Sequence, residues 1–143
     1  MSEPQPMASA LYAEQAAIFV YGLVGVRLTG ADQAEARTAE QAHRQRRDYL
    51  VSRMAQLAVA ALAEPAGYRL PFPVTGRAGA LELAIRIEDG VAQAWRPVLP
   101  TAQGADRTTA LSAMTDAAVR ATRWRQLAAV TPLTLPFPGR PTA

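Results

Sequence analysis

The sequence predicts an all-α protein, a four-helix bundle made of two antiparallel helical hairpins joined by an extended, Pro-rich crossover. Four segments of helical length carry apolar residues at helical spacing and are separated by Gly and Pro. The motif LPFP occurs at residues 70–73 and again at residues 135–138, each time after a pair of these segments. We therefore interpret the chain as two copies of one unit, in which two helices are followed by an extended strap.

The first hairpin consists of a helix at about residues 8–28 and a second helix at about residues 33–64. Gly30 is a typical stop signal for the first helix, and Asp32 is placed to cap the second. We expect Pro65 to end the second helix, because proline has no amide proton and clashes with the preceding turn. The short connection makes the two helices antiparallel neighbours.

The second hairpin consists of helices at about residues 77–99 and 106–130, with Asp106 placed to cap the latter. The segment YRLPFPVT, residues 68–75, is extended because its two prolines exclude a helix, and the C-terminal strap from residue 133 is extended for the same reason. About ten extended residues between the hairpins span about 33 Å at roughly 3.3 Å each, which is about the length of one of these helices. The crossover can therefore return along the bundle.

The length and composition indicate one soluble domain over residues 1–143, with 50% hydrophobic and 19% charged residues. The absence of Cys excludes disulfides, thiolate metal sites and cysteine nucleophiles. The N-terminus lacks the pattern of a signal peptide, and the longest uncharged apolar run, residues 16–26, is too short to span a bilayer. We expect a cytoplasmic protein without a membrane segment.

The basic residues give no sign of a nucleic-acid surface. All 15 of them are Arg, and the net charge is +3. The one cluster, Arg44, Arg46 and Arg47, is distributed in different directions around a single helix and forms no basic face. We therefore expect no nucleic-acid partner.

The second helix places ionisable groups in line with apolar ones. At 3.6 residues per turn, Glu40, His43 and Arg47 project within roughly 60° of one another. Leu50 and Met54 continue the same line. The stripe that enters the core therefore has charged groups at one end, and a buried charge needs a partner, a metal or a shifted pKa.

Two further carboxylates fall on core-facing lines of other helices. Glu88 lies at the centre of the apolar arc of the third helix, and Glu14 lies in line with apolar residues of the first. A guanidinium pairs readily with carboxylates in a fork geometry, so we expect Arg47 to contact one of them directly. The predicted polar core consists of Glu14, Glu40, His43, Arg47 and Glu88.

A Glu on the first helix (Glu14), Glu-x-x-His on the second (Glu40 and His43) and a Glu on the third (Glu88) resemble the ligand order of ferritin-like di-iron carboxylate proteins. Across nearly the whole chain, the sequence also resembles a ferritin-like domain family of unknown function from actinobacteria. The similar stretches are AEQAAIFVYGLVG, HRQRRDYL, LPFPVT, LAIRIEDGVAQAWR and TDAAVRATRWR. This resemblance implies a ferritin-like four-helix bundle and no established activity.

The fourth helix departs from the di-iron pattern, which requires a second Glu-x-x-His there. The corresponding region is MTDAAVRA, in which Asp116 is the only acid and Val119 stands at the His position. In a register one residue earlier, Thr115 and Ala118 stand at the two positions and Asp116 lies at the edge of the bundle. The apolar arc of Leu111, Met114, Ala118 and Ala121 favours this second register without deciding between the two. A metal site on this chain would retain Glu14, Glu40, His43, Glu88 and Asp116.

Two functional hypotheses follow from these residues. The guanidinium of Arg47, one turn from His43, would repel a divalent cation. We therefore expect no cofactor and no catalytic residue, and a non-enzymatic module whose salt-bridged core replaces the metal site. The alternative is a redox or oxygen-handling protein that binds iron or manganese at the degenerate carboxylate and His site.

The first helix indicates self-association. It has no charged residue between residues 16 and 26, whereas a helix packed on one side of a bundle has a polar stripe. Phe19, Leu23 and Val26 on its outer face need a cover wider than an extended strap. We expect a homodimer with the first helix at or beside the two-fold axis.

Overall fold

A computed structural model describes residues 5–141, and these residues form four α-helices, one short 3₁₀ turn and no β-strand. The all-α prediction is therefore confirmed. The helices are α1 (Pro6–Gly25), α2 (Gly30–Leu57), α3 (Arg77–Trp95) and α4 (Gly104–Ala128), and the 3₁₀ turn η1 (Arg96–Val98) follows α3.

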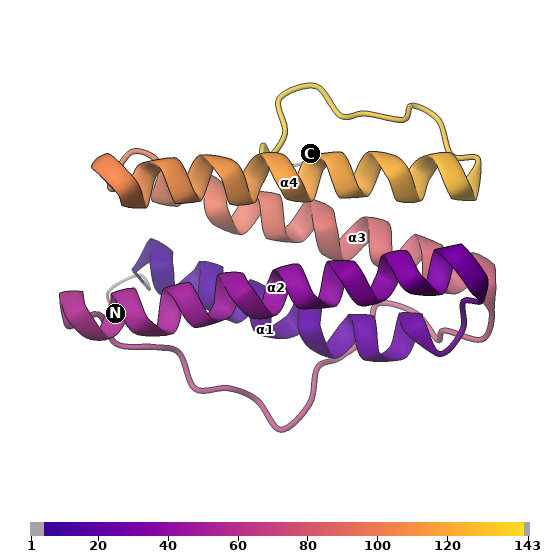
Figure 1. The fold of residues 1–143 in the computed structure, drawn as a ribbon, viewed down its shortest axis with the longest axis horizontal. Coiled ribbons are helices and arrows are strands. Elements are labelled where there is room, and N and C mark those ends of the chain that lie inside the picture. The colour runs from indigo at the N-terminus through magenta and orange to yellow at the C-terminus, as the bar shows by residue number, and fades with distance from the viewer. Residues whose placement is uncertain (1–4, 142–143) are drawn as a thin grey trace.

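The four helices lie side by side as two antiparallel hairpins (Figure 1). Helix α1 packs against α2 and α3, and α3 packs against α1 and α4, so α1 and α3 are the central helices. The chain crosses from the end of α2 to the start of α3 through residues 58–76, which run along the outside of the first hairpin (Figure 1). As a result, α2 and α3 run in the same direction, and α1 and α4 run in the opposite one (Figure 1).

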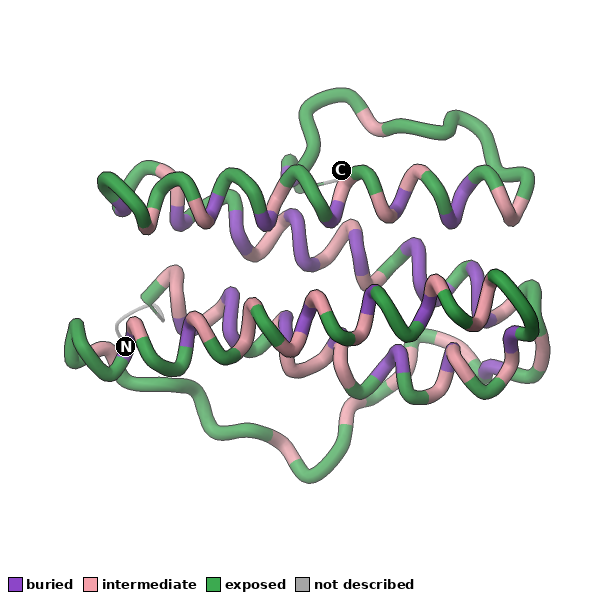
Figure 2. Tube along the Cα trace, in the orientation of Figure 1, coloured by how far each residue is buried: buried purple, intermediate pink, exposed green. Residues whose placement is uncertain are grey.

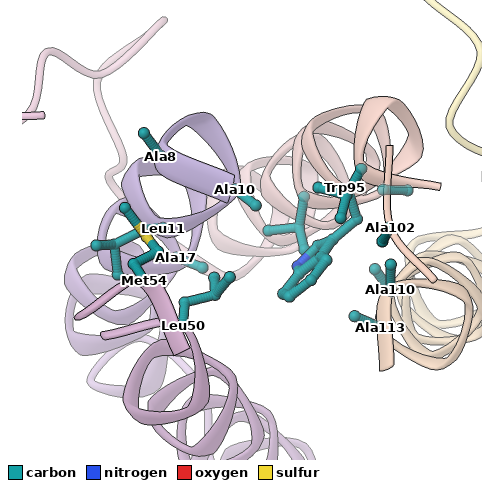
Figure 3. Close-up of a cluster of buried hydrophobic side chains, with 14 residues drawn as sticks. Ala8, Ala10, Leu11, Ala17, Leu50, Met54, Trp95, Ala102, Ala110 and Ala113 are labelled. Carbon is teal, nitrogen blue, oxygen red and sulfur yellow. The ribbon is translucent and has the colours of Figure 1, made fainter. Parts of the chain in front are cut away.

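Two apolar clusters fill the interior, where the buried positions of the helices face one another (Figure 2). In the first, the Trp95 ring lies between Leu50 of α2 and small residues of the second hairpin (Figure 3). The second contains Tyr21 and Trp124. The inner face of α4 is made of buried alanines, which allow a close approach to α3: Ala110, Ala113, Ala117 and Ala121.

All four helices end before the predicted positions, and α1 ends at Gly25 instead of about residue 28. Helix α2 ends at Leu57 instead of about residue 64, because Ala58 adopts a left-handed conformation with φ of 55°. The following residues 60–64 are exposed, so no packing contact holds them in a helix despite their Ala-rich sequence. Helix α3 gives way to η1 at Arg96, where Pro97 removes an amide donor. Helix α4 ends at Ala128, because Ala129 also has a φ of 55°.

The two aspartates predicted as caps lie inside the first turns of their helices and make no side-chain capping bond. The residues at the N-cap positions of α2 and α4 are Thr29 and Gln103. Asp32 pairs instead with Arg77 of α3, and Asp106 pairs with Arg53 of α2. Both aspartates therefore form ion pairs between helices.

The first strap, residues 68–75, covers parts of α1 and α3. Val74 is buried, and Leu70 and Phe72 pack against the second apolar cluster. The ring of Tyr68 lies 5.7 Å from that of Tyr12 and 5.2 Å from that of Phe19, measured between centroids. Phe19 nevertheless remains 38% exposed, so this strap covers only part of the outer face of α1.

Helix α1 is long and apolar enough, by length and composition alone, to cross a membrane. In the folded chain, 44% of its apolar window is buried. The central position of α1 between α2 and α3 accounts for this apolar composition.

Candidate functional site

A buried network of ionisable side chains lies at mid-length of the helices, between the two apolar clusters. Glu14 comes from α1, His43 from α2 and Glu88 from α3, and their exposed fractions are 0%, 2% and 0%. On α2 and α3, one cluster lies on one side of the charged residue and the other cluster on the other side, whereas on α1 the first cluster extends past Glu14 to Ala17. The three groups are therefore shielded from water along the bundle axis.

His43 bridges the two carboxylates. Its Nδ1 lies 2.6 Å from Oε2 of Glu14, and its Nε2 lies 2.7 Å from Oε1 of Glu88. A neutral imidazole has one N–H, so its other nitrogen would point a lone pair at a carboxylate oxygen, where no hydrogen bond can form. Only the protonated imidazolium donates a hydrogen bond to both carboxylates at once.

Aromatic donors complete the hydrogen bonds of the two carboxylates. The indole of Trp95 donates to Oε1 of Glu14 over 2.8 Å, and the hydroxyl of Tyr21 donates to Oε1 of Glu88 over 2.6 Å. The indole of Trp124 in turn donates to the Tyr21 hydroxyl over 2.9 Å. The large aromatic residues of both clusters thus point their polar atoms into the network, which satisfies its buried acceptors.

Arg120 of α4 supplies the second positive charge. Its guanidinium lies 3.3 Å from Oε2 and 3.5 Å from Oε1 of Glu88, and its side chain is 17% exposed. With Glu14 and Glu88 ionised and His43 protonated, two negative charges face two positive charges. The network is therefore neutral as a whole, which lowers the cost of its burial.

Burial and the carboxylates act in opposite directions on His43. Burial lowers the pKa of His43, whereas the charge of Glu88 and the hydrogen bonds to Glu14 and Glu88 raise it, and the net result is a pKa of about 9. The pKa of Tyr21 lies well above its usual value, chiefly because of burial and secondly because of the Glu88 charge. At neutral pH, His43 is thus an imidazolium and Tyr21 is a neutral donor.

Two predicted members of the polar core lie outside the network. Glu40 pairs with Arg44 one turn along α2 at 3.1 Å. Arg47 pairs with its neighbour Asp48 at 2.9 Å, and its side chain is 32% exposed. The prediction that Arg47 contacts a core carboxylate is therefore wrong. Arg47 lies at the edge of the buried stripe, where its long side chain reaches water instead of the core.

Both proposed registers of α4 also miss the network. Asp116 pairs with Arg46 of α2 at 2.8 Å and is 52% exposed, and Val119 is exposed as well. The residue that reaches Glu88 is Arg120, which the sequence reasoning did not select. Its position four residues before the buried Trp124 and seven after the buried Ala113 is a signal that could have identified it.

The sequence matches the family described as "Domain of unknown function (DUF4439)" over residues 6–142. The chain belongs to this family. The DUF4439 fold described above is similar to the crystal structure of a conserved hypothetical protein, Rv2844, from Mycobacterium tuberculosis, with a TM-score of 0.80 and 37% sequence identity. This match covers 85% of the present chain and 93% of the other. No curated protein gives a significant match.

Replacing Arg120 should destabilise this DUF4439 domain more than replacing Arg47. In Arg120→Met the aliphatic stem is kept and the charge is removed, which leaves Glu88 with less compensation, and we expect a loss of about 2 kcal/mol or more in unfolding free energy. Arg47→Met removes the exposed ion pair between Arg47 and its neighbour Asp48, and should lower the unfolding free energy by less than about 0.5 kcal/mol. Urea unfolding measures both values. Equal losses in the two variants would contradict the assigned role of Arg120.

The pKa of His43 predicts a fall in stability of the domain with rising pH. Folding raises this pKa from the ordinary 6.5 to about 9, so the folded state holds the proton more tightly than the unfolded state. The resulting stabilisation is fully present below about pH 6.5 and is lost as pH rises through about 9. Urea midpoints across this range should fall for the wild type and fall less for His43→Gln. Parallel pH profiles for the two proteins would show that His43 does not cause the effect.

Proposed function

We propose that this protein is a non-catalytic, ferritin-like helical module in which a salt-bridged core stands where related bundles hold metals. The helix order supports the ferritin-like assignment, because bundles of that class join two antiparallel hairpins by one long crossover. The functional proposal rests on one observation: both ring nitrogens of His43 form hydrogen bonds with carboxylates. A histidine held in this way has no lone pair for a metal.

The donor set does not fit a two-metal site. Such a site needs a carboxylate from each helix and two histidines, whereas Glu40 and Asp116 form ion pairs with Arg44 and Arg46 away from the network. The guanidinium of Arg120 lies against Glu88, where a bridging metal would have to bind. A permanent positive charge at this position repels a divalent cation and disfavours its binding. We therefore assign no cofactor and no catalytic residue.

The alternative function is a redox or oxygen-handling protein that binds iron or manganese through the chemically suitable side chains of Glu14, His43 and Glu88. Binding would require His43 to lose its proton and Arg120 to leave Glu88. We further propose a cytoplasmic location, which fits both hypotheses.

Metal analysis of protein purified without an affinity tag tests the proposed function. We expect far less than one ion per chain, and no saturable binding when Fe²⁺ or Mn²⁺ is added under anaerobic conditions. Near-stoichiometric metal that is lost in Glu14→Ala and Glu88→Ala would overturn the proposal. Glu82→Ala is the matched control, because Glu82 lies on α3 but is 58% exposed and pairs with Arg86 one turn away.

The module is further proposed to act as a homodimer through α1. Phe19 on the outer face of this helix is 38% exposed, Val26 directly after the helix is 74% exposed, and the first strap covers the face only in part. Apolar residues grouped on the surface of a soluble protein indicate an interface, and a two-fold dimer is the commonest arrangement.

Light scattering at micromolar concentration should return twice the monomer mass of 15.3 kDa. Val26→Glu should shift the mass toward that of the monomer, because it introduces like charges across the two-fold axis. Val51→Glu is the control, since Val51 is 52% exposed on α2 and the substitution should leave the dimer intact. A monomeric wild type, or dissociation by Val51→Glu alone, would count against this interface.

A further inference from the structure

A hollow of about 400 Å³ lies between α3, α4 and the C-terminal segment that follows α4. Its size is within the range of small-molecule sites, about 300 to 1,000 Å³. It is separate from the buried network, because none of Glu14, His43, Glu88 or Arg120 lines it. This hollow takes no part in the function proposed above.

The walls are mainly apolar. Ala92 of α3 and Met114 and Ala118 of α4 form one side, and Leu135 and Pro138 of the C-terminal segment form the cover. Side chains with hydrogen-bonding groups, among them Gln93 and Thr115, lie on the same surface. An apolar wall with a few polar groups is the usual composition of a ligand site.

The cover is fixed in place by Gly139. This glycine has a φ of +81°, and a Cβ atom added to it would lie 2.9 Å from the carbonyl oxygen of Ala92 and 3.0 Å from Sδ of Met114. Only glycine permits this backbone conformation together with such close contact to α3 and α4. The C-terminal segment is thus held against both helices.

The two copies of the LPFP motif use their Phe differently. Phe72 of the first copy packs against the second apolar cluster, and the guanidinium of Arg86 lies 5.1 Å from the centre of its ring. Phe137 of the second copy has a φ of 55° and is 68% exposed. The second strap therefore crosses the helices without inserting its aromatic residue into the hollow beneath it.

Three charged residues line the hollow, and two of them, Asp89 and Arg125, compensate each other. Arg125 is 7% exposed and donates a hydrogen bond to Asp89 of α3, and both residues line the hollow. An anionic ligand would meet Asp89, and a cationic ligand would meet Arg125, so either charge would disturb a partly buried ion pair. The third charged residue, Arg140, is exposed, and its guanidinium lies 5.8 Å from the centre of the Phe137 ring, so water and salt screen its charge. The two less exposed charges of the wall therefore favour an uncharged ligand.

We propose that this hollow is a binding site for a small, uncharged, mainly apolar molecule, held between α3 and α4 beneath the C-terminal segment. The apolar walls bind the body of the molecule, and the polar groups beside them orient a single hydrogen-bonding substituent. The site is independent of the polar core.

Two fluorescent probes that share one ring system test the charge preference. N-phenyl-1-naphthylamine is uncharged, and 8-anilino-1-naphthalenesulfonate is its anionic counterpart. We expect saturable binding of one uncharged probe per chain, with an affinity at least about tenfold higher than that of the anion, a difference of about 1.4 kcal/mol. Failure of the uncharged probe to bind, or equal affinity for the two probes, would overturn the proposal.

Matched substitutions locate the bound probe. Ala118→Phe fills the hollow and should weaken binding of the uncharged probe at least about tenfold. Ala16→Phe makes the same change in a separate hollow between α1, α3 and the first strap, and should leave binding unchanged. The reverse pattern, or no effect of Ala118→Phe, would exclude the proposed site. Melting temperatures verify that both variants remain folded.

Two further variants keep the proposal testable if Ala118→Phe does not fold. Gly139→Ala should displace the cover and weaken binding of the uncharged probe, because the added Cβ collides with α3 and α4. Asp89→Asn removes the negative charge that compensates Arg125, and should reduce the preference for the uncharged probe at least about tenfold. An unchanged probe affinity in Gly139→Ala, or an unchanged preference in Asp89→Asn, would contradict the assignment of the site.

Discussion

The packing of this protein depends on the protonated imidazole of His43, held between the carboxylates of Glu14 and Glu88. Each of these side chains, taken alone, would be costly to bury in its charged form. Together with Arg120, they form a neutral group in which the hydrogen bonds of the carboxylates are satisfied by nitrogen and hydroxyl donors. One residue from each helix contributes to this group, so it fixes the positions of all four helices relative to one another.

We infer that the network contributes more to a unique arrangement of the helices than to total stability. Replacing buried ions with well-packed apolar residues is often neutral or stabilising, whereas breaking one pair is destabilising. A shift of one helix along its axis would separate His43 from one of its carboxylates, while apolar contacts tolerate such a shift more easily. The alanines on the inner face of α4 illustrate this point, because Ala113 and Ala117 offer little shape to define a register. Arg120 and the Trp124 indole fix the register of α4 through directed hydrogen bonds to Glu88 and Tyr21.

Sequence patterns located the inward-facing charged residues on α1, α2 and α3, because Glu14, His43 and Glu88 lie in line with apolar residues of those helices. The inner face of α4 consists mainly of alanines, which are common on both faces of a helix, so the spacing of Arg120 from Ala113 and Trp124 was the one signal that set it apart from a surface arginine. Arg47 shares the stripe of His43, but its position at the edge lets a long side chain turn toward Asp48. The end of α2 was missed because helix propensity favours the Ala-rich residues after Leu57, and the absence of a packing partner for them appears only in three dimensions.

The most direct test of this account is the protonation state of the single histidine, measured by the ¹⁵N chemical shifts of the imidazole in specifically labelled protein at neutral pH. The account predicts that Nδ1 and Nε2 both carry a proton and that each shows a coupling or through-space contact consistent with a carboxylate acceptor. A spectrum with one protonated and one unprotonated nitrogen would identify a neutral imidazole. That result would contradict the bridging imidazolium on which the rest of the structure depends.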